Sequence, residues 1–162
     1  MDRQVQQTLR TSAVALLLLI TATGFCQSTD AELNRAIDTF YASIESGDPE
    51  PRIALLADDV IMMPNHWILS SGSETIAGSY RSGQDSGMLF KIRDREILQL
   101  ELSGGIAYTV NSYWYAYYPV NEGPQWHRTK NVHIWRRQED GSWRLAVDIW
   151  NSDVPLDQFR EE

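Results

Sequence analysis

The last two strand-like segments of the chain bring an imidazole and a carboxylate opposite each other. Residues 126–137 and 143–151 are rich in aromatic and β-branched side chains, and the Asp140-Gly141 dipeptide between them is typical of a tight hairpin turn. With this turn, the pairing predicts that His133 lies opposite Asp148 on one face of the sheet. An aspartate beside a histidine fixes the tautomer of the ring and favours its charged form, which suits general acid/base catalysis.

The same pairing sorts the neighbouring side chains onto two faces. It predicts Asn131 opposite Trp150, and Trp135 opposite Ala146, on the face that carries the imidazole and the carboxylate. The alternate face is expected to be aliphatic, with Val132, Ile134, Leu145, Val147 and Ile149. One face of this hairpin is therefore mixed aromatic and polar, and the other is plain apolar packing.

The turn before this hairpin extends the mixed face. A turn in which Val120 faces Gln125 would place Ser112 beside His133 and Trp114 beside Asn131. The resulting patch contains Ser112, Trp114, Asn131, His133, Asp148 and Trp150. Aromatic walls with a few polar groups are typical of a pocket for a small molecule.

Two other interpretations of this patch stay open at the level of sequence. A histidine opposite an aspartate on a sheet is also an ordinary cross-strand pair, which contributes about 0.2–1 kcal/mol. The mixed face could also be the outer, convex surface of the sheet, where tryptophan, asparagine and arginine serve contacts between subunits. The face that the helices cover decides between these interpretations.

Helices are predicted in the first half of the chain. Thr29 and Glu32 have the spacing of a capping box at the start of the first helix, and Gly47 fits its end. An apolar stripe at helical spacing follows the cap, formed by Leu33, Ala36, Ile37, Phe40, Tyr41 and Ile44. A short second helix is expected over residues 49–56 and a third over residues 73–81.

The second half of the chain has the pattern of strands. A short strand over residues 60–63 comes first. Long strands separated by turn residues are then predicted over residues 91–102, 106–118, 126–137 and 143–151. Helices followed by such strands indicate the α+β class, with the helices packed on one face of a curved antiparallel sheet.

Several spaced motifs agree in order with those of a known superfamily. They are Ser46-Gly47-Asp48, Leu55-Leu56-Ala57-Asp58-Asp59-Val60, Gly72-Ser73-Glu74-Thr75-Ile76, the segment 135–145 and the segment 148–153. The chain resembles the nuclear transport factor 2-like superfamily, in its SnoaL-like and ketosteroid-isomerase-like branch of small bacterial proteins. The resemblance covers about residues 31–155 and implies a cone-shaped fold that encloses a pocket.

The resemblance also indicates which chemistry to expect. Steroid isomerases of this superfamily use a tyrosine of the first helix, at the position of Phe40, and an aspartate just before a proline, at the position of Met63. Phenylalanine and methionine cannot transfer a proton, so both positions serve only as pocket wall. We therefore expect binding of a small apolar molecule without steroid-isomerase chemistry; the alternative is a lyase or isomerase in which Asp148 or His133 is the base.

The N-terminal segment has the order of a secretory signal. Arg3 and Arg10 precede the apolar run 13–20, which is too short to cross a bilayer as a helix, and small residues follow. Residues 1–26 are therefore predicted to be removed, which leaves the domain 27–162 outside the cytoplasm, in the periplasm if the cell is Gram-negative.

The single cysteine, Cys26, lies at the end of this segment. Cleavage after Gly24 or after Cys26 fits the small residues that signal peptidases read, and lipid modification of Cys26 is the alternative. The domain then has no disulfide and no thiolate site. Loss of Asp2, Arg3 and Arg10 changes the net charge from −8 to −9, which argues against a nucleic-acid partner.

Metals and cofactors are not expected, whereas self-association is. None of the 3 histidines shares a metal-ligand spacing with another, and we predict no cofactor. Aromatic side chains occur on both faces of residues 106–118, although a fully solvated face would not need them. The sequence therefore predicts a homodimer whose only membrane contact is the signal segment or a lipid on Cys26.

Overall fold

The computed structural model describes residues 30–153, and the predicted signal segment 1–26 lies outside the described residues. The elements are α1 (Ala31–Ser46), α2 (Glu50–Ile53), β1 (Leu56–Met63), β2 (Ser70–Ser71), α3 (Ser73–Asp85), β3 (Met88–Ser103), β4 (Ile106–Pro119), β5 (His127–Arg137) and β6 (Trp143–Ser152). The α+β class predicted from the sequence is confirmed. The third helix is four residues longer than expected. The second helix ends at Ile53 rather than at Leu56, and β1 begins four residues earlier than expected, directly after a turn at residues 54–55.

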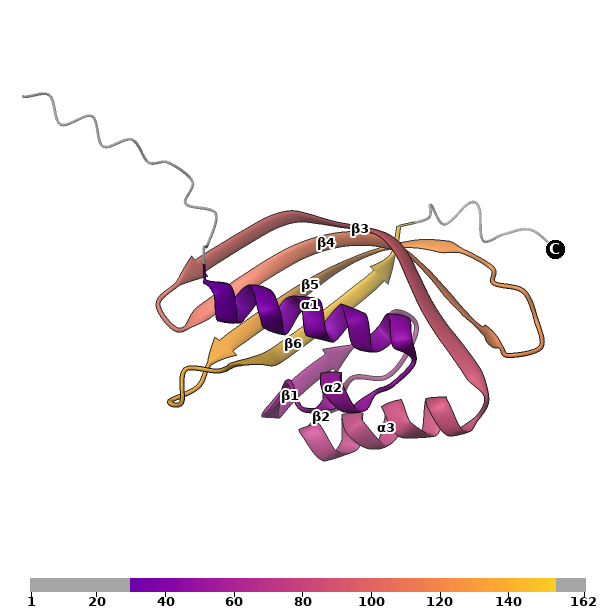
Figure 1. Cartoon of the computed structure of the whole chain (residues 1–162), viewed down its shortest axis with the longest axis horizontal. Coiled ribbons are helices and arrows are strands. Elements are labelled where there is room, and N and C mark those ends of the chain that lie inside the picture. Colours follow the sequence, from indigo (N-terminus) through magenta and orange to yellow (C-terminus); the bar gives the residue numbers. More distant parts are fainter. Residues whose placement is uncertain (1–29, 154–162) are drawn as a thin grey trace, which may run out of the picture.

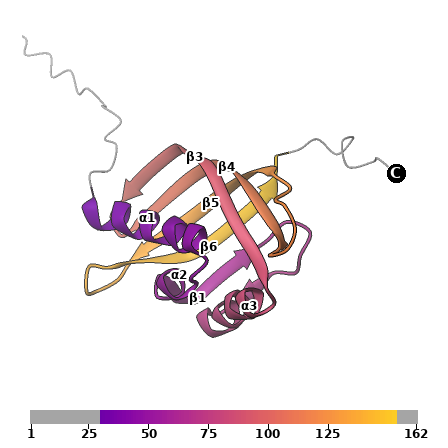
Figure 2. The same ribbon diagram turned by 45° about the vertical axis from the view of Figure 1, so that its right-hand side comes forward.

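The six strands form one curved sheet in the order β2-β1-β6-β5-β4-β3. All neighbouring strands are antiparallel except β1 and β6, which run parallel, so the expectation of a purely antiparallel sheet is corrected at this pair. Figures 1 and 2 show α1 lying lengthwise across the concave side of the sheet, with α2 and α3 beside β1. We call the face that α1 covers the inner face and the opposite one the outer face.

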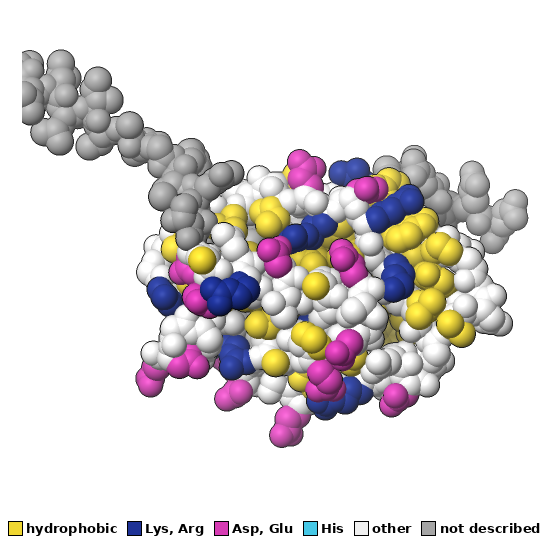
Figure 3. Space-filling view, in the orientation of Figure 1, with side chains coloured by type: hydrophobic (Ala, Val, Ile, Leu, Met, Phe, Trp, Pro, Cys, Tyr) yellow, Lys and Arg dark blue, Asp and Glu magenta, His cyan; other side chains and the backbone are white. Residues whose placement is uncertain are grey.

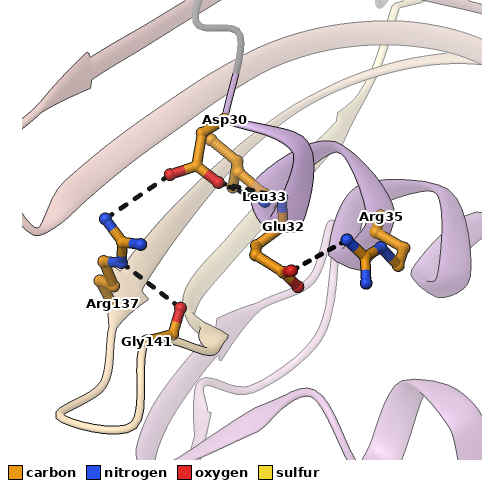
Figure 4. A network of polar contacts seen from close by, with 6 residues as sticks. All are labelled: Asp30, Glu32, Leu33, Arg35, Arg137 and Gly141. Carbon is orange, nitrogen blue, oxygen red and sulfur yellow. Dashed lines mark hydrogen bonds and ion pairs between the residues drawn. The ribbon is translucent and has the colours of Figure 1, made fainter.

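The first helix is capped by a carboxylate one residue later than the sequence suggested. Asp30 Oδ1 accepts hydrogen bonds of 3.0 Å from the backbone N–H groups of Glu32 and Leu33, so the capping box that starts at Thr29 is wrong. Figure 4 shows the second oxygen of Asp30 directed at Arg137, the last residue of β5; the distance to Arg137 Nη1 is 3.7 Å. The C-terminal end was predicted correctly, because Gly47 has φ 79° and its N–H donates to the carbonyl of Ile44.

This cap should make stability depend on pH in the acid range. The pKa of Asp30 lies below its ordinary value, chiefly because Leu33 N–H donates to the carboxylate; Trp143 and Arg137 add to this effect, and burial opposes it. A lowered pKa in the folded state means that the charged cap stabilises the fold at higher pH and loses this contribution as pH falls through the folded-state pKa.

We expect Asp30→Ala to destabilise the fold at neutral pH by about 1 kcal/mol, or about 4 °C in melting temperature. The control is Asp30→Asn, which keeps an oxygen that can cap the helix but cannot titrate. Thermal melts should show that the difference between wild type and Asp30→Asn shrinks as the pH falls below 4. A difference that stays constant from neutral to acid pH would contradict this role of the carboxylate.

The core lies between α1 and the inner face of the sheet. Its largest fully buried side chains include Leu33 and Ile37 of α1, Trp135 of β5, and Trp143 and Leu145 of β6. The position of Leu145 corrects the sequence prediction, which assigned it to the aliphatic face. The reason is a β-bulge: Trp135 pairs with Leu145 rather than with Ala146, and the extra residue in β6 shifts the alternation.

None of the helices in the described part of the chain is both long enough and apolar enough to cross a membrane.

Candidate functional site

The pairing of β5 with β6 brings the predicted imidazole and carboxylate together. His133 lies opposite Asp148, and Asn131 lies opposite Trp150, as the sequence predicted. These side chains lie on the inner face, because the ring of Phe40 on α1 packs 4.9 Å from the ring of His133. The helices therefore cover the mixed face, and the interpretation of this pair as outer surface is wrong.

The pairing of β4 with β5 differs from the prediction. Thr109 lies opposite His133, while Ser112 lies opposite Lys130 and Trp114 opposite Arg128. The connection between the strands is longer than the four-residue turn that was assumed. The register therefore shifts by an odd number of residues, and each side chain of β4 lies on the face opposite to the one expected. Ser112 and Trp114 consequently lie on the outer face and do not belong to the site.

Polar residues of β4 take their place on the inner face. Thr109 and Asn111 are fully buried there, and Asn111 Nδ2 donates to Thr109 Oγ1 at 2.9 Å. Asn111 also lies opposite Asn131, beside the histidine. The sequence analysis missed both residues, although they alternate correctly with Ala107 and Tyr113 once the register is known.

The imidazole of His133 is enclosed by aromatic rings and has no exposed surface. The rings of Phe40 and Trp135 meet it edge to face at 4.9 and 5.8 Å, and the ring of Tyr41 stacks on it at 5.8 Å. Such a cage fixes the plane of the ring and keeps water and ligands away from it. His133 can therefore act only through the groups that its ring nitrogens touch.

One ring nitrogen makes both polar contacts of His133. Nε2 lies 2.7 Å from the side-chain amide of Asn131 and 3.2 Å from Asp148 Oδ1, whereas Nδ1 has no partner among the described residues. The single proton of a neutral ring is best placed on Nε2, where two acceptors can face it if the Asn131 amide presents its oxygen. In this arrangement His133, itself held by Asn131, lies behind the side chain of Asp148.

Asp148 forms part of the wall of a pocket of about 490 Å³. The pocket lies between the three helices and the inner face of β1, β3, β4 and β6, and its lining includes Phe40, Ile44, Arg52, Met62, Ser79, Tyr80, Phe90, Lys91, Tyr113, Tyr117, Asp148 and Trp150. Most of these side chains are aromatic or aliphatic. Figure 3 shows hydrophobic side chains gathered at the end of this face where β3 rises from α3.

Apart from Ser112 and Trp114, the predicted site residues divide into three groups. Phe40, Asp148 and Trp150 line the pocket, while His133 and Asn131 lie behind it. Met63 is the third case: it pairs with Ile149 and is 37% exposed, and its neighbour Met62, which pairs with Asp148, lines the pocket instead. The parallel pairing of β1 with β6 decides which of the two neighbouring methionines faces the pocket, and alternation in the sequence alone does not reveal it.

Three tyrosines lie within the electrostatic field of the Asp148 carboxylate. Burial raises the pKa of Tyr80 and of Tyr113, both of which line the pocket, and the negative charge of Asp148 raises each further. Burial also raises the pKa of Tyr41, which stacks on His133. All three phenols therefore remain protonated at any physiological pH, and those of Tyr80 and Tyr113 can donate hydrogen bonds inside the pocket.

Comparison with solved structures identifies the architecture. A ketosteroid isomerase-like protein from Erwinia carotovora atroseptica matches with a TM-score of 0.66 and 18% identity, over 77% of this chain and 96% of that chain. A nuclear transport factor 2-like superfamily protein from Salmonella enterica serovar Typhimurium matches with a TM-score of 0.65 and 13% identity, over 81% of this chain and 95% of that chain. The chain has the nuclear transport factor 2-like fold.

A further nuclear transport factor 2-like protein, of unknown function in nutrient uptake, from Rhodospirillum rubrum, matches with a TM-score of 0.63 and 19% identity, over 75% of this chain and 98% of that chain. No protein-family model and no curated protein matches the sequence. Identities this low establish the fold alone, and a nuclear transport factor 2-like fold carries many functions. What the chain does must therefore be argued from its own pocket.

Proposed function

We propose that this chain is an exported domain that binds a small, largely apolar molecule in the pocket closed by Asp148. The observation that carries the proposal is the lining: aromatic rings from α1, α3, β3, β4 and β6 meet around one cavity of about 490 Å³, which lies within the range of ligand pockets. Neither catalytic position of the steroid isomerases carries a proton donor or acceptor, since they are Phe40 and Met63.

Filling the pocket mouth tests the binding function. Ser79 is exposed on α3 and lines the pocket, so Ser79→Trp should obstruct the pocket without disturbing the core. Neutral phenylnaphthylamine, whose fluorescence rises in apolar surroundings, should bind the wild type saturably and bind Ser79→Trp at least about tenfold more weakly, a loss of about 1.4 kcal/mol. Glu74→Trp, on the same helix but outside the pocket, is the control and should bind as the wild type does.

A second function, proton transfer by Asp148 in a lyase or isomerase reaction, is favoured by one specific observation. Asp148 is the carboxylate of the pocket lining, and its Oδ1 faces Nε2 of His133 at 3.2 Å, behind the lining. A carboxylate held in a mostly apolar wall and backed by an imidazole is suited to act as a base. Under this function Asp148 is the catalytic residue and His133 is a positioning residue.

Export is the part of the proposal that rests on residues 1–26. We expect the mature chain to begin between Phe25 and Gln27 and to be recovered outside the cytoplasm. N-terminal sequencing of the extracytoplasmic fraction measures this directly. An intact Met1 on a cytoplasmic product would contradict export, and a lipid-modified terminal Cys26 would support the anchored form.

We further propose a homodimer that forms through the outer face. In the register of β4, β5 and β6, two apolar rows cross this face, Tyr108-Ile134-Val147 and Val110-Val132-Ile149, and no described helix covers them. Sedimentation at micromolar concentration should give twice the monomer mass, and Val132→Asp should give a monomer because a carboxylate is costly in such an interface. A wild type that sediments as a monomer at every concentration would rule the dimer out.

A further inference from the structure

Arg52, which the functions proposed above do not use, is an arginine of the pocket wall. It belongs to α2, is half-buried and lines the pocket, and its guanidinium lies 4.4 Å from the centre of the Tyr80 ring. Within residues 30–153 it makes no ion pair and no side-chain hydrogen bond. The nearby Arg81 behaves differently, because it donates to both carboxylate oxygens of Glu50, at 2.6 and 2.8 Å.

An arginine without a partner in such surroundings carries an energetic cost. Burial lowers the pKa of Arg52, which means that the protein penalises its charge, and the fields of Tyr80 and Asp48 only partly offset this effect. Stacking on Tyr80 covers one face of the guanidinium but leaves its in-plane N–H groups free to donate. A planar fork of free donors matches the two oxygens of a carboxylate or a related oxyanion.

The other charges of the pocket fix the direction in which an anion would bind. Lys91 also lines the pocket, and its ammonium donates to the carbonyl of Glu45 at the end of α1, at 2.7 Å. Asp148 is the carboxylate in the lining. The Tyr80 phenol feels charges of both signs, because Asp148 raises its pKa and Arg52 lowers it. An anionic group would be repelled by Asp148 and attracted by Arg52 and Lys91.

We propose that the ligand of this pocket is a small organic acid: an apolar body held by the aromatic walls, with one anionic group bound to the guanidinium of Arg52. The proposal rests on the binding function proposed above and adds the ligand class. The body of the ligand then extends toward Asp148, which meets a hydrogen-bond donor or an acidic C–H group of the ligand. Recognition of the anion gives the half-buried arginine the partner that the described part of the chain lacks.

Two probes with the same ring system separate this inference from the binding function. Anilinonaphthalene sulfonate is an anion, and phenylnaphthylamine is the neutral compound without the sulfonate. Fluorescence titration should show that the wild type binds the anion more tightly than the neutral probe. Arg52→Gln should weaken binding of the anion by about tenfold or more, since a hydrogen bond to a charged partner is lost, and should leave the neutral probe unaffected.

Variants of matched type complete the experiment. Arg52→Lys keeps the charge without the fork and should retain part of the preference for the anion, while Arg81→Gln removes an arginine outside the pocket and should change neither affinity. Equal binding of both probes by wild type and Arg52→Gln would overturn the acid as ligand while leaving the apolar pocket in place. Failure of the wild type to bind either probe would overturn the binding function itself.

Discussion

Asp148→Asn is expected to abolish the ability of the pocket to remove a proton from carbon. Nitrobenzisoxazole is a suitable probe, because it is a small, flat, neutral molecule that opens when a base removes its ring C–H proton. The proton passes to the carboxylate, the C–H electron pair forms a nitrile, and the N–O bond breaks to give a cyanophenolate. We expect the variant to be slower than the wild type by about a hundredfold or more, the usual contribution of a positioned base.

The structure gives the reason for an effect of this size. Asp148 is almost fully buried, at 6% exposure, among side chains of the aromatic wall, so its carboxylate is poorly hydrated and held in place by His133. The amide of asparagine has nearly the same shape and keeps an oxygen to face the His133 ring, but it cannot take a proton. The melting temperature of the variant should therefore stay close to that of the wild type.

Asp59→Asn provides the matched control. Asp59 is an exposed aspartate whose carboxylate accepts hydrogen bonds from Arg136 at 2.9 and 3.0 Å, well away from the pocket lining. Its variant should retain the wild-type rate. If the wild type were no faster than Asp148→Asn, the role of Asp148 as a base would be refuted. A large fall in melting temperature without a specific loss of rate would make Asp148 a structural residue.

Trp135→Ala is expected to have the largest effect on stability. The indole is fully buried, and its ring meets those of Phe40 and His133 edge to face at 6.3 and 5.8 Å. Truncation leaves a large cavity between α1 and the sheet, which should cost about 3–5 kcal/mol and lower the melting temperature by about 10 °C or more. The cage around His133 would open at the same time, so Asp148 would lose part of its support.

Trp67→Ala is the control for this experiment, because Trp67 is 75% exposed in the loop between β1 and β2. Its removal should change stability by no more than about 0.5 kcal/mol. Thermal melts of the two variants under one condition make the comparison. Equal small shifts would contradict the account of the core given above.

Much of the fold could be predicted because local chemistry decides it. The stripe Leu33-Ile44 and the left-handed Gly47 define α1, and alternation with turn residues defines the long strands to within a few residues. The pairing of His133 with Asp148 was also correct, although for a reason that the sequence did not reveal. Near the turn the strands pair one residue out of the expected register, and the β-bulge at Ala146 restores it.

The parts of the site that were mispredicted depend on distant strand pairing. Ser112 and Trp114 were assigned to the pocket because a short turn was assumed, and a shift by three positions moved both to the outer face. Met63 was preferred to Met62 because the side of β1 that faces the pocket depends on its parallel neighbour β6, which lies some 85 residues away in the chain. Arg52 was missed because a single arginine after two prolines carries no sequence signal of a binding site.

Binding of a small apolar molecule in the cavity lined by Asp148 can be seen directly in a crystal structure of the protein with phenylnaphthylamine. We predict one probe molecule per chain, with its rings between Phe40, Tyr113 and Trp150. Binding at that place would also explain the effect expected of Ser79→Trp. A probe found only beside Trp67 or on the outer face of the sheet, with the cavity free of it, would contradict the account.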